Sequence, residues 1–117
     1  MGSKYNFTRS DIKMLILSLL SNKDMYGYQI IQELKLLSNS YFSLQEGSLY
    51  PLLHSLQSEE LINSYWEETA SVRKKKYYVL TQKGKRAFAR EQKEWEKYFT
   101  CINNILEGGK VKNELYS

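Results

Sequence analysis

Basic side chains are concentrated in one part of the sequence. Between Arg73 and Arg90 the chain has eight lysine and arginine residues and no acidic residue, although its net charge is only +4. A local field of one sign attracts polyanions such as nucleic acids. A basic run is more often just a solvated surface, so nucleic-acid binding requires a second indication from the same chain.

A predicted helix that precedes the basic run supplies polar side chains on one face. Leucines at positions 49, 52, 53 and 56 have helical spacing and define a buried face. Pro51 is tolerated in a first helical turn, because the amide it lacks would be unpaired there, and this predicts a helix that starts near Gly47 or Ser48 and ends near Glu59. The opposite, polar face comprises Gln45, Ser48, Tyr50, His54 and Ser55.

The polar face has the position that base-reading residues take in a helix-turn-helix. There the N-terminal residues of the third helix meet base edges in the major groove. The bare amides at Gly47 and Ser48 also favour a phosphate. The basic run after this helix begins with Arg73, Lys74, Lys75 and Lys76, where a winged helix has its DNA-contacting wing. Together these features predict DNA binding. The alternative is a plain core helix with a solvated outer face.

The sequence has few residues suited to catalysis or metal binding. His54 is the only imidazole, Cys101 is the only thiol, and there is no carboxylate pair, phosphate loop or metal-ligand spacing. We therefore expect no enzyme activity, metal or cofactor. The lone cysteine fits a reducing cytoplasm. The uncharged stretch from Met14 to Asn22 is far shorter than a membrane span, and no signal peptide is recognisable.

Three helices are predicted before the basic run. Thr8 and Asp11 form a capping box for the first, with Phe7 and Ile12 placed as a hydrophobic staple. One face of this helix can serve the core of the domain, while Met14 and Leu17 would require a second partner. Asp24 is expected to cap the second helix, which has an apolar stripe at Ile30, Ile31, Leu34 and Leu37.

The pattern then changes to strands and a long helix. Residues 61–68 and 75–80 are rich in Ile, Tyr, Trp and Val and predict a two-stranded hairpin. Thr81 caps a last helix expected to stop at Gly108-Gly109. The predicted fold is mainly α with a small β-hairpin, organised as a winged helix-turn-helix domain (1–80), a C-terminal dimerisation helix (81–107) and a flexible tail (108–117).

The last helix carries an apolar seam. Its residues follow steps of four and three, as in a coiled coil, and are Phe88, Gln92, Trp95, Phe99, Ile102 and Leu106. Tyr98, Cys101 and Ile105 widen the seam beyond what one 117-residue chain needs for its own core. We expect a homodimer through this helix, and the alternative is a monomeric core.

Two stretches resemble a known family. GSLYPLLHSLQSEELINSYWEE (47–68) followed by RKKKYYVLTQKGK (73–85) is similar to the PadR family of bacterial transcriptional regulators, as is Tyr26-Gly27-Tyr28-Gln29-Ile30 on the second helix. The resemblance covers about residues 12–107. Two positions depart from the family pattern: Glu60 replaces a usual glycine before the strand, and Val72 stands where the wing tip often has glycine.

The resemblance implies a homodimeric repressor that binds an operator in double-stranded DNA. A short chain with one C-terminal helix resembles the multidrug-sensing branch, in which a tryptophan on that helix lines a flat pore between subunits. The corresponding residue here is Trp95. A planar aromatic effector is therefore expected to contact Met14, Trp95, Tyr98 and Phe99. The rival interpretation is a winged-helix module that binds another protein and neither DNA nor a ligand.

Overall fold

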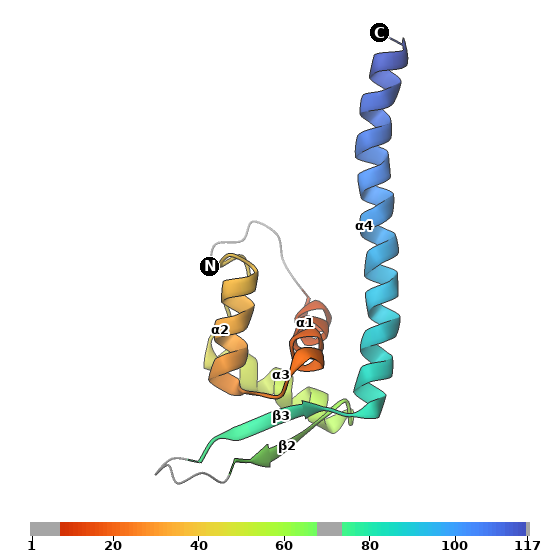
Figure 1. The fold of residues 1–117 in the computed structure, drawn as a ribbon. Helices are drawn as coiled ribbons and strands as arrows, with labels where there is room; N and C mark the ends of the chain where they lie inside the picture. The colour runs from red at the N-terminus through yellow and green to blue at the C-terminus, as the bar shows by residue number, and fades with distance from the viewer. Residues whose placement is uncertain (1–7, 68–73, 117) are drawn as a thin grey trace.

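The computed structural model describes residues 8–67 and 74–116, with side chains described up to residue 108. In chain order, the elements are α1 (Arg9–Asn22), β1 (Met25–Tyr26), α2 (Gly27–Leu37), α3 (Glu46–Ser58), β2 (Ile62–Trp66), β3 (Lys76–Leu80) and α4 (Gln82–Tyr116). In Figure 1, α1, α2 and α3 form a body above the sheet, and α4 runs beside α1 and then projects beyond it. The prediction of a mainly α, winged-helix fold is confirmed.

The core lies between the three helices and the inner face of the sheet. Its largest fully buried side chains come from α1, α2, α3 and β2, and they are Ile16, Leu17, Ile30, Leu49, Leu53, Leu56 and Ile62. Leu17 is 0% exposed, so the prediction that it faces a second partner was wrong. Met14 is half-buried and packs against this core.

The sheet has three antiparallel strands in the order β1-β3-β2, one more than predicted. β1 has only two residues, too few to show an alternating pattern in the sequence. Its pairing moves the start of α2 to Gly27, with Tyr26 as the N-cap. The prediction that Asp24 caps α2 was therefore wrong, and the Asp24 carboxylate instead accepts a hydrogen bond from the Tyr65 hydroxyl at 2.7 Å.

The N-terminus of α1 has the predicted capping box. The Asp11 amide donates to the Thr8 hydroxyl at 3.0 Å, and the Thr8 amide donates to the Asp11 carboxylate at 3.4 Å. These bonds satisfy amides that have no partner within the helix. Phe7, the other half of the predicted staple, lies outside the described residues.

Pro51 lies deeper in α3 than predicted. The helix begins at Glu46 with Gln45 as N-cap, so Pro51 is in the second turn rather than the first. Its missing amide leaves the Gly47 carbonyl without the usual partner four residues on. Gly47 is exposed, so solvent can satisfy that carbonyl.

The start of α4 is held by Thr81. Its hydroxyl accepts from the Gly84 amide at 2.9 Å and donates to the Glu60 carbonyl at 2.7 Å, while its amide donates to the Leu61 carbonyl at 3.1 Å. The predicted cap is confirmed. The predicted end at Gly108-Gly109 was wrong, because α4 continues to Tyr116. Glycine inside a helix costs only about 1 kcal/mol and does not by itself end one. Among the described helices, none is long and apolar enough to cross a membrane.

Candidate nucleic-acid interface

The outer face of α3 presents the predicted polar residues to solvent. Gln45, Gly47, Ser48, Tyr50 and His54 are exposed, whereas the four leucines of the helix are buried. The helical spacing therefore separates the two faces as the sequence indicated. Ser55 is the exception in the predicted polar face.

Ser55 belongs to a hydrogen-bonded cluster between α1 and α3. The Lys13 ammonium donates to the Ser55 hydroxyl at 3.1 Å and to the Glu59 carboxylate, and Ser55 also donates to Glu59 at 3.1 Å. The bond from Lys13 is the main cause that lowers the pKa of Glu59, with Ser55 acting in the same direction and burial opposing both. Ser55 therefore fastens the C-terminal end of α3 to α1.

A hollow lies between α3, the start of α2 and the base of the wing, by which we mean the point where the loop between β2 and β3 leaves the strands at Trp66 and Lys76. We call it the wing-base hollow, and it measures about 330 Å³. Its described lining residues are Tyr26, Gly27, Tyr28, Tyr50, Trp66, Lys74, Lys75, Lys76 and Tyr78. The hollow thus brings Tyr50 of the predicted recognition helix together with the three described wing lysines.

Strand β1, which was not predicted, places Tyr26 in the hollow. Tyr26 pairs with Tyr77, and Tyr77 pairs with Tyr65, so the three rings lie side by side across the sheet. Tyr26 meets Tyr77 edge-on with ring centroids 5.5 Å apart, and Tyr65 stacks on Tyr77 at 5.7 Å. The Lys75 ammonium lies 4.3 Å from the Tyr26 ring centroid, within cation–π range.

The basic run divides between two elements. Lys74, Lys75 and Lys76 lie at the wing base, whereas Lys83, Lys85, Arg86 and Arg90 are exposed on α4. Arg73 and Val72 lie outside the described residues. Only the wing lysines are thus shown to adjoin α3.

Gly47 and Ser48 line a different hollow from Tyr50. This second hollow, of about 350 Å³, lies between the starts of α1 and α3, and its described lining includes Thr8, Arg9 and Pro51. The polar residues predicted as one DNA-binding set are therefore divided between two concave surfaces on either side of α3. Gln45 and His54 line neither hollow.

Sequence reasoning missed several residues of these surfaces. Arg9 adjoins α3 only through tertiary packing, and Tyr26, Tyr28 and Trp66 reach the wing lysines only because β1 joins the sheet. The available signals were the ten tyrosines of the chain and the Tyr26-Gly27-Tyr28 motif.

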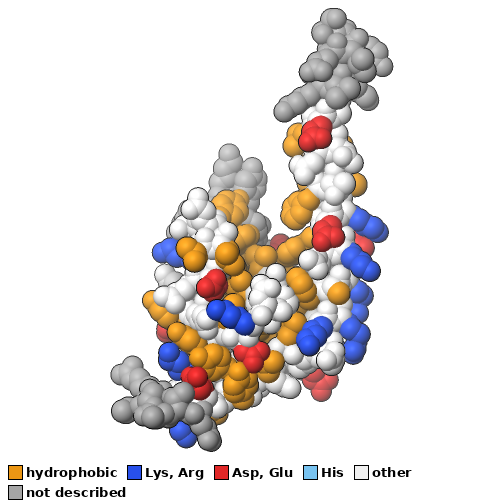
Figure 2. All heavy atoms as spheres, in the orientation of Figure 1, with side chains coloured by type: hydrophobic (Ala, Val, Ile, Leu, Met, Phe, Trp, Pro, Cys, Tyr) orange, Lys and Arg blue, Asp and Glu red, His pale blue; other side chains and the backbone are white. Residues whose placement is uncertain are grey.

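Among the described residues, the first part of the seam on α4 packs against the rest of the chain and the later part is exposed. Phe88 packs against the core and Trp95 is half-buried. Gln92 is exposed, and further along Phe99 is 56%, Ile102 37% and Leu106 62% exposed. Figure 2 shows hydrophobic side chains along the edge of α4 that faces the body in this view, with basic side chains along the opposite edge.

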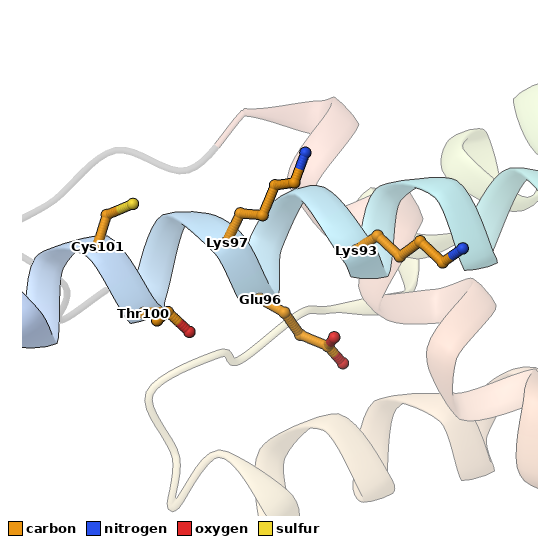
Figure 3. Close-up of a pocket in the computed structure, with 5 residues that line it drawn as sticks. All are labelled: Lys93, Glu96, Lys97, Thr100 and Cys101. Carbon is orange, nitrogen blue, oxygen red and sulfur yellow. The ribbon is translucent and has the colours of Figure 1, made fainter.

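The predicted effector residues are unevenly placed. Met14 and Trp95 are half-buried, whereas Tyr98 and Phe99 are exposed, with ring centroids 5.7 Å apart. A separate hollow on α4, of about 420 Å³, is lined by Lys93, Glu96, Lys97, Thr100 and Cys101 (Figure 3). None of the predicted effector residues lines that hollow.

Comparison with known proteins gives consistent matches. The sequence model of the transcriptional regulator PadR-like family matches residues 16–90. An uncharacterized protein of Lysinibacillus sphaericus, protein X, is 34% identical over 100 residues, which cover 86% of this chain and 92% of that protein.

Two solved structures show the same fold. A PadR family transcription regulator from Clostridium difficile is 36% identical, with a TM-score of 0.69 over 81% of this chain and 97% of that one. A PadR-like transcriptional regulator from Bacillus cereus is 31% identical, with a TM-score of 0.74 over 84% of this chain and 93% of that one.

Proposed function

Because the chain belongs to the PadR-like family of transcriptional regulators, we propose that it is a homodimeric repressor that binds operator DNA through α3 and the wing. The family assignment agrees with the expectation that the chain is not an enzyme. The observation that carries the proposal is that Tyr50, on the exposed face of α3, and the wing lysines line the same hollow. Base edges would be met by α3 and backbone phosphates by the lysines.

The salt dependence of duplex binding tests the DNA-binding part. Each phosphate contact contributes about −0.9 to the slope of log affinity against log salt. The Lys74→Gln/Lys75→Gln variant should therefore reduce the magnitude of the slope by about 2 and weaken binding to all sequences. The matched control is Lys93→Gln/Lys97→Gln, which removes the same charge from exposed positions on α4 and should leave the slope unchanged.

Two results would contradict this part of the proposal. A slope that falls equally in both variants would mean that net charge, and not the wing, determines affinity. An unsubstituted chain that binds no duplex at low salt would favour the protein-interaction alternative.

The uncovered seam of α4 supports the homodimer. Phe99, Ile102 and Leu106 are too exposed in a single chain for such apolar side chains, and a second copy of α4 would bury them. Light scattering at micromolar concentration should give twice the chain mass of 13.8 kDa. Ile102→Asp should give a monomer, whereas the control Thr100→Asp, two residues away on α4, should remain a dimer. A monomeric parent chain would contradict the proposal.

We further propose that a planar aromatic effector binds between the Trp95 side chains of the two subunits. A flat ring between two indoles gains about 0.5–1.5 kcal/mol per aromatic pair beyond burial, and a cationic ring gains more. The effector would release DNA by binding better to a dimer whose recognition helices are wrongly spaced.

Fluorescence tests the effector proposal. A flat cationic dye should quench Trp95 emission in a Trp66→Phe background, where one indole remains. Trp95→Ala should abolish dye binding and leave the dimer intact. A Trp95→Ala chain that is monomeric, with no quenching in its parent, would instead make Trp95 a packing residue of the interface.

A further inference from the structure

We propose that the wing-base hollow is the seat of one backbone phosphate of the bound duplex, so that Tyr50 holds the register of α3 instead of reading a base. This inference rests on the proposed DNA-binding function and deepens it. It assigns one class of ligand group, a phosphodiester, to a defined hollow between α2, α3 and the wing.

The charge of the hollow selects an anion. Lys74, Lys75 and Lys76 contribute three cations, and no acidic residue is among the described lining. Three lysine residues that line one hollow of about 330 Å³ raise the local positive potential, which a bound anion would lower. A phosphodiester carries the required charge and acceptor oxygens, whereas a base edge carries no net charge.

Aromatic rings hold two of these lysines in place. Lys75 lies 4.3 Å from the Tyr26 ring centroid, and Lys76 lies 5.9 Å from the ring centroids of both Trp66 and Tyr78. Lysine otherwise loses much side-chain freedom when it binds. The rings restrict that freedom beforehand, so a phosphate meets ammonium groups that are already positioned.

Gly27 allows Tyr50 to enter the hollow. A Cβ atom at Gly27 would lie 2.5 Å from the Tyr50 hydroxyl oxygen and 3.0 Å from the ring carbon that bears it. The Tyr50 ring and hydroxyl therefore lie directly against the first residue of α2, and Tyr50 lines the same hollow as the wing lysines. The N-cap of α2, Tyr26, makes no side-chain capping bond to the first turn of that helix.

The inference explains why Tyr50 and Ser48 line different hollows although both are exposed on α3. A phosphate held on the wing side of the helix would fix the height and rotation of α3 in the groove. Residues on its other exposed positions, such as His54, would then meet the bases. Phosphate contacts fix register in this way without carrying sequence information themselves.

A scan with neutral phosphate analogues tests the proposal. Duplexes that carry one methylphosphonate linkage at successive positions are titrated with the chain, and affinity is measured for each. The affinity of the unsubstituted chain should fall about tenfold when the neutral linkage occupies the one position in each half-site that faces the wing base. The affinity of the Lys75→Gln/Lys76→Gln variant should fall less than about twofold with the neutral linkage at that position. Neutral linkages at other contacted positions should still lower its affinity. The control Lys93→Gln/Lys97→Gln should show the parental pattern.

A second variant separates positioning from base reading. Tyr50→Phe keeps the ring against Gly27 and removes only the hydroxyl, so the fold is retained. It should lower affinity several-fold for all sequences and reduce the effect of the same linkage. A changed base preference with an unchanged linkage pattern would make Tyr50 a base-reading residue and overturn the inference.

The outcomes distinguish the two levels of the proposal. If the chain binds duplex DNA but the lysine variant keeps the full parental linkage pattern, only the phosphate seat is wrong. If the unsubstituted chain binds no duplex at all, the proposed function and the seat both fail.

Discussion

Gly84→Ala should destabilise the fold strongly, because the chain has no room for a methyl group there. Gly84 is buried in the first turn of α4, and a Cβ atom would lie 2.1 Å from the Leu61 carbonyl oxygen and 2.9 Å from a methyl carbon of Leu80. Carbon–oxygen contacts are ordinarily about 3.3 Å or longer. The first turn of α4 must therefore retreat by about 1 Å.

The neighbouring hydrogen bonds oppose that movement. The Leu61 carbonyl accepts from the Thr81 amide, and the Leu61 amide donates to the Leu56 carbonyl at 3.0 Å, so the obstructing backbone is held on both sides. Overpacking costs about 1–3 kcal/mol, and a weakened N-cap at Thr81 about 1 kcal/mol. The preference of a helix for alanine over glycine returns up to about 1 kcal/mol. These contributions span about 1–4 kcal/mol, and we expect a net loss near the middle of that range, about 2–3 kcal/mol.

Thermal and urea unfolding, followed by circular dichroism at one fixed chain concentration, measure this loss. A destabilisation of this size corresponds to a fall in Tm of roughly 10–20 °C for a domain of about 100 residues. Gly47→Ala is the matched control, because nothing lies within 4 Å of a Cβ there, and it should be neutral or stabilising by up to about 1 kcal/mol. If the unfolding free energy of Gly84→Ala lies within about 0.5 kcal/mol of the parental value, Gly84 has room for a methyl group and the prediction is refuted.

Three further predictions concern the turn before the wing and its surroundings. Glu60 has a φ of 62°, in the left-handed region, so Glu60→Gly should raise the unfolding free energy by about 1 kcal/mol in urea titrations, and a loss would contradict the strain. Thr81→Ala removes the hydroxyl that bonds Gly84 and the Glu60 carbonyl, and the same titrations should show a loss of about 1–2 kcal/mol. Lys13 lowers the pKa of Glu59, so this carboxylate stabilises the fold above its ordinary pKa of about 4.5, and the contribution is lost as the pH falls through the lowered value. Glu59→Gln should therefore flatten the acid limb of the stability–pH profile, and an unchanged limb would show that the ion pair contributes nothing.

The helices and the two longer strands could be predicted from periodicity and capping. Thr8 with Asp11, and Thr81 before the last helix, are local signals because the capping bond spans only a few residues. The leucine spacing in α3 likewise identified the buried face of that helix. Such elements are determined by neighbouring residues, so they can be predicted without knowledge of the tertiary structure.

Features that depend on tertiary pairing were missed or misplaced. β1 forms because Met25 and Tyr26 pair with β3. This pairing places the start of α2 at Gly27, so Asp24 is too far from the helix to cap it. The start of α3 was predicted one or two residues too late, at Gly47 or Ser48 instead of Glu46, because an exposed second turn tolerates the bond lost at Pro51 as well as a first turn does. The two-hollow division of the α3 surface follows from how α1 and the wing pack on either side, which spacing along one helix does not encode.

The composition of the DNA complex tests the central claim most directly. Duplexes enriched from a random pool by the full chain are sequenced, and the mass of the complex with one enriched duplex is measured by sedimentation. The account predicts inverted repeats with half-sites about 34 Å apart, or a multiple of that spacing, and a mass equal to two chains and one duplex. No enrichment over the pool, or one chain on a non-repeated site, would contradict a dimeric DNA-binding regulator.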